Sequence, residues 1–109
     1  MLQEDKERLQ HILFAESSIQ RVLGDMTLQD FYESELHTNT VIRYLGVIGE
    51  AASRISDELK EAHPEVPWYK IVGMRNRLVH DYYDIDLDAV WGAATVSLPI
   101  LRKQLAALL

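Results

Sequence analysis

The stretch TNTVIRYLGVIGEAASRISDELKEA, residues 38–62, has the apolar periodicity of a helix that buries one face. Its apolar side chains recur every three or four residues, at Val41, Leu45, Ile48, Ala52, Ile55 and Leu59. Gly46 and Gly49, with the alanines that follow them, leave room for another helix to approach closely. We therefore predict a long helix from about Thr38 to Ala62 as the centre of the fold.

Helical patterns continue on the N-terminal side of this stretch. One apolar stripe is formed by Leu9, Ile12, Leu13, Ile19, Val22 and Leu23. Gly24 is placed to end that helix. Thr27 and Asp30 have the spacing of a capping box, with Asp in place of the usual Glu, so we predict that they begin a short helix containing Phe31 and Tyr32.

On the C-terminal side, prolines mark where helices begin and bend. Residues 63–67, His-Pro-Glu-Val-Pro, break the chain. Pro67 suits the first position of a helix that we predict from Trp68 to about Tyr82. In a later helix Pro99 should produce a kink or a split, because proline lacks the N–H that an α-helix needs.

Asp84 or Asp86 can cap that last helix, whose apolar residues are Val90, Trp91, Val96, Leu98, Ile100, Leu101 and Leu105. No segment shows a convincing strand-like alternation. The sequence therefore predicts one all-α domain, residues 1–109, built as an antiparallel bundle of four main helices plus a short helix.

Composition narrows the classes of protein. The 109 residues include no Cys, which excludes disulfides, thiolate catalysis and Cys-based zinc sites. The net charge of −6 and a pI near 5.1 argue against broad coating of nucleic acid, but leave room for a local basic pocket or a basic partner. With no apolar leader after Met1 and no membrane-length apolar run, we expect a cytoplasmic protein with no membrane partner.

The segment MRNRLVHDYY, residues 74–83, contains several side chains that can bind phosphate or transfer protons. Arg75 supplies a permanent charge and a planar donor fork suited to phosphate, and His80 can transfer protons near neutral pH. On an ideal helix Asn76 shares a face with His80, and Arg75 with Tyr82, whereas Arg75 and His80 diverge by about 140°. Either the helix loosens near His80, or a second copy of the chain completes the site.

The run Arg75-Asn76, three residues, then His80-Asp81-Tyr82 resembles the Arg-polar-xxx-His motif of HEPN domains, with the extra x-Tyr of HepT-like toxins. The similarity covers nearly the whole chain. It includes, in the same order and spacing, Ile48-Gly49-Glu50-Ala51, Pro67-Trp68, Gly73-Met74-Arg75-Asn76 and Val90-Trp91.

This resemblance implies a HEPN-like helical homodimer with a composite active cleft. It implies a metal-independent ribonuclease toxin, without a cofactor, encoded beside an MNT-type nucleotidyltransferase antitoxin. Arg75 would bind the scissile phosphate of RNA, His80 would act as general acid or base, and Asn76 would orient one of them. Tyr82 would line the cleft and receive AMP from the antitoxin.

For three other residues the sequence leaves more than one role open. Arg77 lies four residues before Asp81 and suits a solvated ion pair or an RNA contact. Arg43 and Glu50 share a face of the long helix, where they could border the cleft or serve a structural or antitoxin-facing role. A calcium loop beginning at Asp84 is rejected because its required Gly and Glu are absent, so no metal site is predicted.

Two other functions fit the same residues. One is a noncatalytic HEPN binding module that partners a nucleotidyltransferase, which the acidic pI favours slightly. The other is a plain helical dimer in which the motif is only interface.

Overall fold

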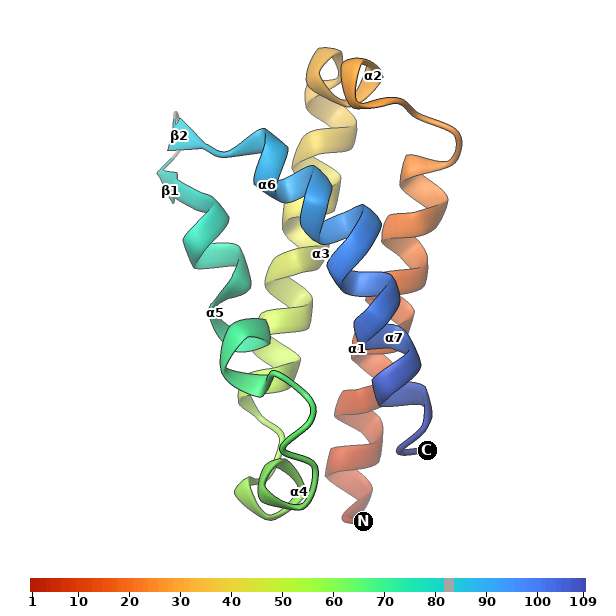
Figure 1. Ribbon diagram of the computed structural model, residues 1–109, viewed down its shortest axis with the longest axis vertical. Coiled ribbons are helices and arrows are strands. Elements are labelled where there is room, and N and C mark those ends of the chain that lie inside the picture. The colour runs from red at the N-terminus through yellow and green to blue at the C-terminus, as the bar shows by residue number, and fades with distance from the viewer. Residues whose placement is uncertain (82–83) are drawn as a thin grey trace.

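Helices running alternately up and down build this molecule (Figure 1). The computed structural model describes residues 1–81 and 84–109. In chain order its elements are α1 (Gln3–Leu23), α2 (Leu28–Glu33), α3 (Glu35–Ser53), α4 (Asp57–Ala62), α5 (Trp68–Leu78), β1 (Val79–Asp81), β2 (Asp84–Ile85), α6 (Leu87–Gly92), the π-helical η1 (Ala93–Ser97) and α7 (Leu98–Ala106). The predicted all-α, HEPN-like bundle is thus confirmed.

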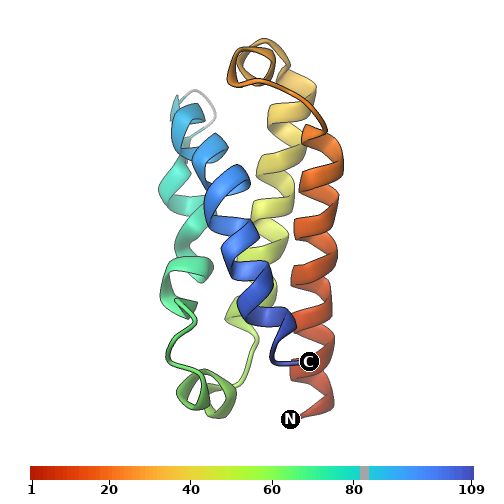
Figure 2. The ribbon, with the colours of Figure 1, turned by 45° about the vertical axis from the view of Figure 1, so that its right-hand side comes forward.

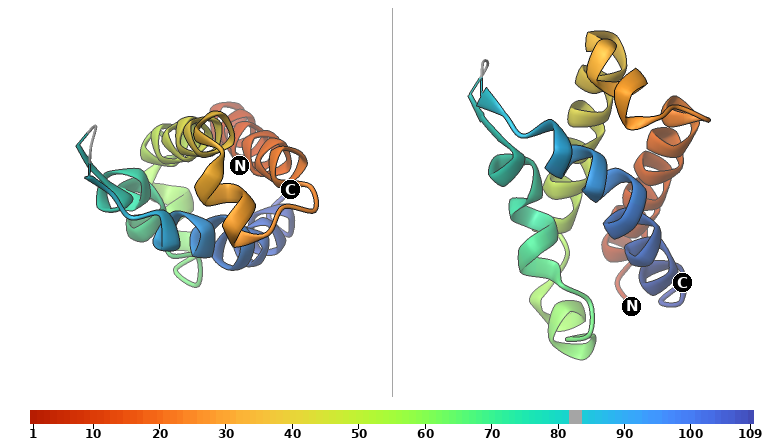
Figure 3. Two further views of the ribbon diagram at one scale, coloured as in Figure 1. Left: turned by 90° about the horizontal axis from the view of Figure 1, so that it is seen from above. Right: turned by 45° about the horizontal axis from the view of Figure 1, so that its top comes forward.

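The long helices pack around one apolar core. α1 and α3 lie side by side, and both chain ends lie at the same end of the bundle (Figure 2). Viewed from above, α2 crosses over the end of the bundle and the β1–β2 pair projects at its side (Figure 3). No described helix combines the length and apolar character that a membrane crossing requires.

Glycine permits the predicted close contact between α3 and α5. A Cβ at Gly49 would lie 3.1 Å from the backbone oxygen of Val72 and 3.5 Å from that of Ile71. Any larger residue would therefore push α5 outward. This contact fixes α5, which carries Arg75, against the buried face of α3.

The end of α1 and the start of α2 lie where the sequence predicts. Gly24 ends α1 with a φ of 49°, a conformation that side chains with a Cβ rarely adopt. Thr27 Oγ1 accepts from the Asp30 N–H at 3.1 Å, and an Asp30 oxygen accepts from the Thr27 N–H at 3.0 Å. The capping box is complete with Asp in the position usually held by Glu.

The predicted single helix from Thr38 to Ala62 is wrong, because the chain breaks between α3 and α4. The buried carboxylate of Asp5, on α1, accepts from the Ser56 N–H at 2.9 Å and from its hydroxyl at 2.6 Å. Ser56 Oγ also accepts from the Leu59 N–H and caps α4. In a continuous helix the N–H groups of Ser56 and Leu59 would donate to backbone carbonyls of the preceding turn. Here they donate to the side chains of Asp5 and Ser56 instead.

Asp5→Ala is expected to lower the free energy of unfolding by about 1.5–3 kcal/mol, because it removes a charged acceptor and leaves the Ser56 N–H without its partner. Urea unfolding followed by circular dichroism measures this change. Glu4→Ala is the control, since Glu4 is exposed in the same first turn and removes only a helix-dipole contribution of about 0.3–1 kcal/mol. Equal losses for both variants would contradict a specific role for Asp5.

The predicted extension of the next helix to Tyr82 is also wrong. Pro67 is the N-cap rather than the first helical residue, and α5 ends at Leu78. Val79 then adopts an extended conformation and pairs with Ile85 in an antiparallel two-stranded ladder. The Leu78 carbonyl accepts from the Asp86 N–H at 3.0 Å. This hairpin pairing replaces the helical hydrogen bonds that would have continued α5.

The last helical segment agrees with the sequence. The Asp86 carboxylate accepts from the Ala89 N–H at 3.0 Å and caps α6. The π-helical η1 directly precedes Pro99, which occupies the first turn of α7. The helix is therefore widened where proline removes a donor from the ladder.

Candidate functional site

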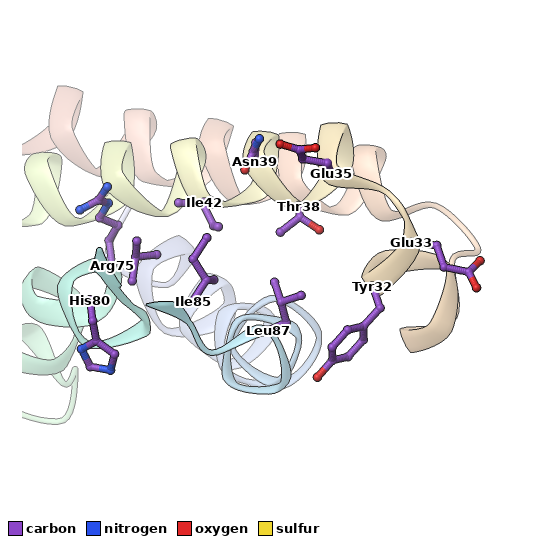
Figure 4. A pocket seen from close by; sticks show the side chains of 11 residues that line it. Tyr32, Glu33, Glu35, Thr38, Asn39, Ile42, Arg75, His80, Ile85 and Leu87 are labelled. Atoms are coloured by element: carbon purple, nitrogen blue, oxygen red, sulfur yellow. The ribbon is translucent and has the colours of Figure 1, made fainter. Parts of the chain in front are cut away.

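A pocket of about 650 Å³ opens between α2 and α3 on one side and β1, β2 and α6 on the other. Arg75 and His80 line it together with Thr38, Asn39 and Ile42 of α3 (Figure 4). The segment that the sequence marks as chemical thus meets residues about forty positions earlier in the chain. This meeting depends on the close contact of α5 with α3.

Arg75 and His80 reach the pocket from different elements. Arg75 is in the last turn of α5, His80 is in β1, and both side chains are exposed. The Arg75 side chain extends toward α3, whereas the His80 ring points away from it (Figure 4). The helix ends before His80, as the first of the two alternatives expects, and completion of the site by a second copy stays a prediction. The divergence of the two side chains nevertheless persists within one chain.

The opposite end of the pocket is acidic. Glu33 and Glu35 line it, and the Tyr32 hydroxyl donates to Asp88 Oδ1 at 2.6 Å, joining α2 to α6. This hydrogen bond is the main reason that the pKa of Tyr32 lies above its ordinary value of 10.0. Desolvation of the phenol and the negative charges of Asp88 and Asp86 raise the pKa further. The pocket therefore runs from a basic end to an acidic end.

Comparison with known proteins decides the family. The family model described as Ribonuclease HepT-like matches residues 12–108.

The chain belongs to the HepT-like ribonuclease family.

Named relatives agree with this membership. The protein named "Putative RNase TTE0752" from Caldanaerobacter subterraneus subsp. tengcongensis is 36% identical over 93% of this chain and 90% of its own length. "Putative RNase MJ0125" from Methanocaldococcus jannaschii is 35% identical over 73% of this chain and 69% of its own length. "Probable ribonuclease HepT" from Thermococcus cleftensis is 31% identical over 94% of this chain and 93% of its own length. No solved structure matches. The resemblance drawn from the motif is thus confirmed.

Not every candidate residue of this HepT-like chain lies at the pocket. Asn76 is exposed on α5 and does not line it, and its predicted helical pairing with His80 is wrong because His80 lies beyond the helix. Arg77 turns back over Gly73 and donates to the Lys70 carbonyl. The predicted ion pair of Arg77 with Asp81 involves a side chain outside the described ones, and Tyr82 also lies outside the described residues.

Arg43 and Glu50 share a face, as predicted, but they line a separate hollow. This hollow, of about 470 Å³, lies between α1 and α3. Glu50 forms an ion pair with Arg54 at 2.8 Å. Among the side chains that the structure describes, those of residues 1–80 and 84–109, no group of three His, Asp or Glu is arranged to hold a metal ion.

The sequence pattern missed the α2–α3 side of the HepT-like pocket. Tyr32 lies near the end of the short α2, and Glu35 and Asn39 lie in the first turns of α3, where polar residues are ordinary. No local motif distinguishes them. Only the packing of α5 and β1 against α3 identifies them as neighbours of Arg75 and His80.

Proposed function

We propose that this chain is a metal-independent endoribonuclease toxin that cleaves RNA with Arg75 and His80. The observation that carries the proposal is the placement of both residues at one pocket in a chain of the HepT-like ribonuclease family. A planar guanidinium and a proton-transferring imidazole are the groups that phosphodiester cleavage by a ribose hydroxyl requires.

The chemistry begins at the ribose 2′-OH beside the scissile phosphate. His80 accepts the 2′-OH proton while the 2′ oxygen attacks phosphorus. Arg75 stabilises the negative charge that builds on the phosphate oxygens. The bond from phosphorus to the 5′ oxygen breaks, and that oxygen takes a proton from a general acid. The products are a 2′,3′-cyclic phosphate and a 5′-OH.

The active form in this proposal is a homodimer with a composite cleft. Because the Arg75 and His80 side chains diverge within one chain (Figure 4), each cleft would take Arg75 from one copy and His80 from the other. The second His80 belongs to the other cleft, so water serves as the acid that protonates the leaving oxygen.

Regulation in this proposal acts through Tyr82. A cognate MNT-type nucleotidyltransferase antitoxin, acting in the cytoplasm, transfers AMP from ATP to the Tyr82 hydroxyl and releases pyrophosphate. The phosphate of the added AMP is anionic and bulky, so it blocks RNA entry and weakens the positive field around Arg75.

A noncatalytic HEPN module that partners a nucleotidyltransferase is the second candidate, favoured by the divergence of Arg75 and His80 and the net charge of −6. The experiment that separates the two is incubation of RNA with purified protein that has never met the antitoxin. Cleavage that depends on Arg75 and His80 supports the nuclease. Intact RNA supports the module.

A further inference from the structure

The hollow between α1 and α3 concentrates positive charge in an acidic chain. Arg8 and His11 of α1 face Arg43 and Arg54 of α3 across it, with Glu50 as its one acidic lining residue. Three guanidinium groups thus meet one carboxylate, although the chain as a whole carries −6. We call this feature the α1–α3 hollow.

Two of its arginines are left for a ligand. Glu50 Oε1 accepts from Arg54 Nε at 3.0 Å and lies 2.8 Å from its Nη2, so Glu50 neutralises Arg54. Among the described residues no carboxylate forms an ion pair with Arg8 or Arg43. Arg8 Nε is moreover buried and has no hydrogen-bond partner in that part of the chain. A buried donor without an acceptor is costly unless a ligand supplies one.

The α1–α3 hollow lies next to the Arg75 end of the pocket. Gly46 lines the hollow, and a Cβ at Gly46 would lie 4.0 Å from Arg75 Cγ. Arg43 precedes Gly46 by one helical turn. The stem of Arg75 therefore lies at the boundary between the two cavities, with Arg43 just beyond it.

The charges around Arg75 favour one path for a bound polyanion. The far end of the pocket carries Glu33 and Glu35, which repel phosphate. On the α1–α3 side, an RNA strand that leaves Arg75 meets the positive charges of Arg43 and Arg8. A polyanion that places one phosphate at Arg75 thus has a favourable path over Gly46 toward Arg43 and Arg8.

We propose that the α1–α3 hollow is a phosphate-binding subsite that holds single-stranded RNA next to the cleaved bond, with Arg43 and Arg8 each binding a flanking phosphate. This subsite rests on the proposed ribonuclease function and adds to it the recognition of RNA length. It predicts that longer RNA binds better than RNA covering only the Arg75 end.

The test measures equilibrium binding of 2′-O-methyl RNA, which lacks the attacking hydroxyl, as a trinucleotide and as a decanucleotide. Each phosphate contact with single-stranded nucleic acid contributes a salt slope of about −0.7, or about 5-fold in affinity near 0.1 M salt. The double variant Arg8→Gln/Arg43→Gln should therefore reduce the preference for the decanucleotide about 25-fold. Its salt slope should become shallower by about 1.4.

Lys70→Gln/Lys103→Gln is the matched control, because it also removes two positive charges, from exposed positions on α5 and α7, and it should retain the preference for the longer RNA. Wild-type protein that binds neither RNA would defeat the ribonuclease proposal itself. Wild-type protein that binds the decanucleotide no better than the double variant does would overturn the subsite alone.

A poly-glutamate peptide of equal charge tests whether the occupant is an acidic protein. The RNA subsite predicts that the peptide competes weakly, because flexible carboxylates lack the phosphate geometry that arginine binds in a bidentate manner. Equal loss of peptide and RNA binding in the double variant would assign the α1–α3 hollow to polyanions in general and overturn the proposal.

Discussion

His80→Ala is expected to slow RNA cleavage by about 10²–10⁴-fold, the usual contribution of a positioned general acid or base. Arg75→Ala should cost about 10²–10³-fold, because it removes a donor to the charge that builds on the phosphate. Both side chains are exposed, so neither substitution opens a cavity in the core. Single-turnover cleavage of an RNA oligonucleotide measures the rates, and circular dichroism verifies the fold.

His63→Ala and Lys103→Ala are the controls for loss of an imidazole and of a positive charge. His63 pairs with Glu65 in the loop before α5 and Lys103 is exposed on α7, so both variants should cleave like the wild type. A folded His80→Ala protein with full activity would remove His80 from the mechanism.

Mixing the two inactive variants tests whether the cleft is shared between chains. If Arg75 and His80 come from opposite copies, a mixed dimer of Arg75→Ala and His80→Ala keeps one intact cleft of two. Random reassortment should then restore about a quarter of wild-type activity. No recovery in a mixture that has exchanged subunits would place both residues of each cleft in the same chain.

Tyr82→Phe is expected to abolish silencing by the antitoxin. Phenylalanine lacks the hydroxyl that would form the bond to phosphorus, so co-expression with the nucleotidyltransferase should leave the variant at its unmodified mass and toxic. Wild-type chain should gain mass in AMP units and lose ribonuclease activity, because the added phosphate is an anion at the entrance for RNA. Intact-mass spectrometry, paired with a growth assay, measures both outcomes.

Tyr83→Phe is the matched control for the neighbouring phenol. It should gain the same mass as the wild type and be silenced equally. Wild-type chain that is silenced without any gain of mass would refute AMP transfer and leave direct masking by the antitoxin.

Elements that depend on neighbouring residues could be predicted from the sequence. Gly24 and the Thr27–Asp30 capping box act within one helical turn, so their patterns specify the ends of α1 and the start of α2. The break before α4 could not be predicted in this way. It depends on a bond between Asp5 and Ser56, which are 51 positions apart.

The site, like the fold, could be predicted from the sequence only in part. The sequence motif alone identifies Arg75 and His80, and both line the pocket. The angles predicted from an ideal helix do not apply beyond Leu78, because pairing of Val79 with Ile85 replaces helical hydrogen bonds. Arg75 and His80 therefore diverge as predicted, but they do so because His80 lies in β1 and its ring points away from α3, not because both residues lie on one helix.

The central claim is that a ribose hydroxyl, activated by His80 and aided by Arg75, cleaves RNA without a metal ion. Purified chain that has never met the antitoxin should be incubated with RNA in excess EDTA, and the ends of the products identified by mass spectrometry. We expect undiminished cleavage that yields 2′,3′-cyclic phosphate and 5′-OH ends. Products with 3′-OH and 5′-phosphate ends, or cleavage abolished by EDTA, would contradict it.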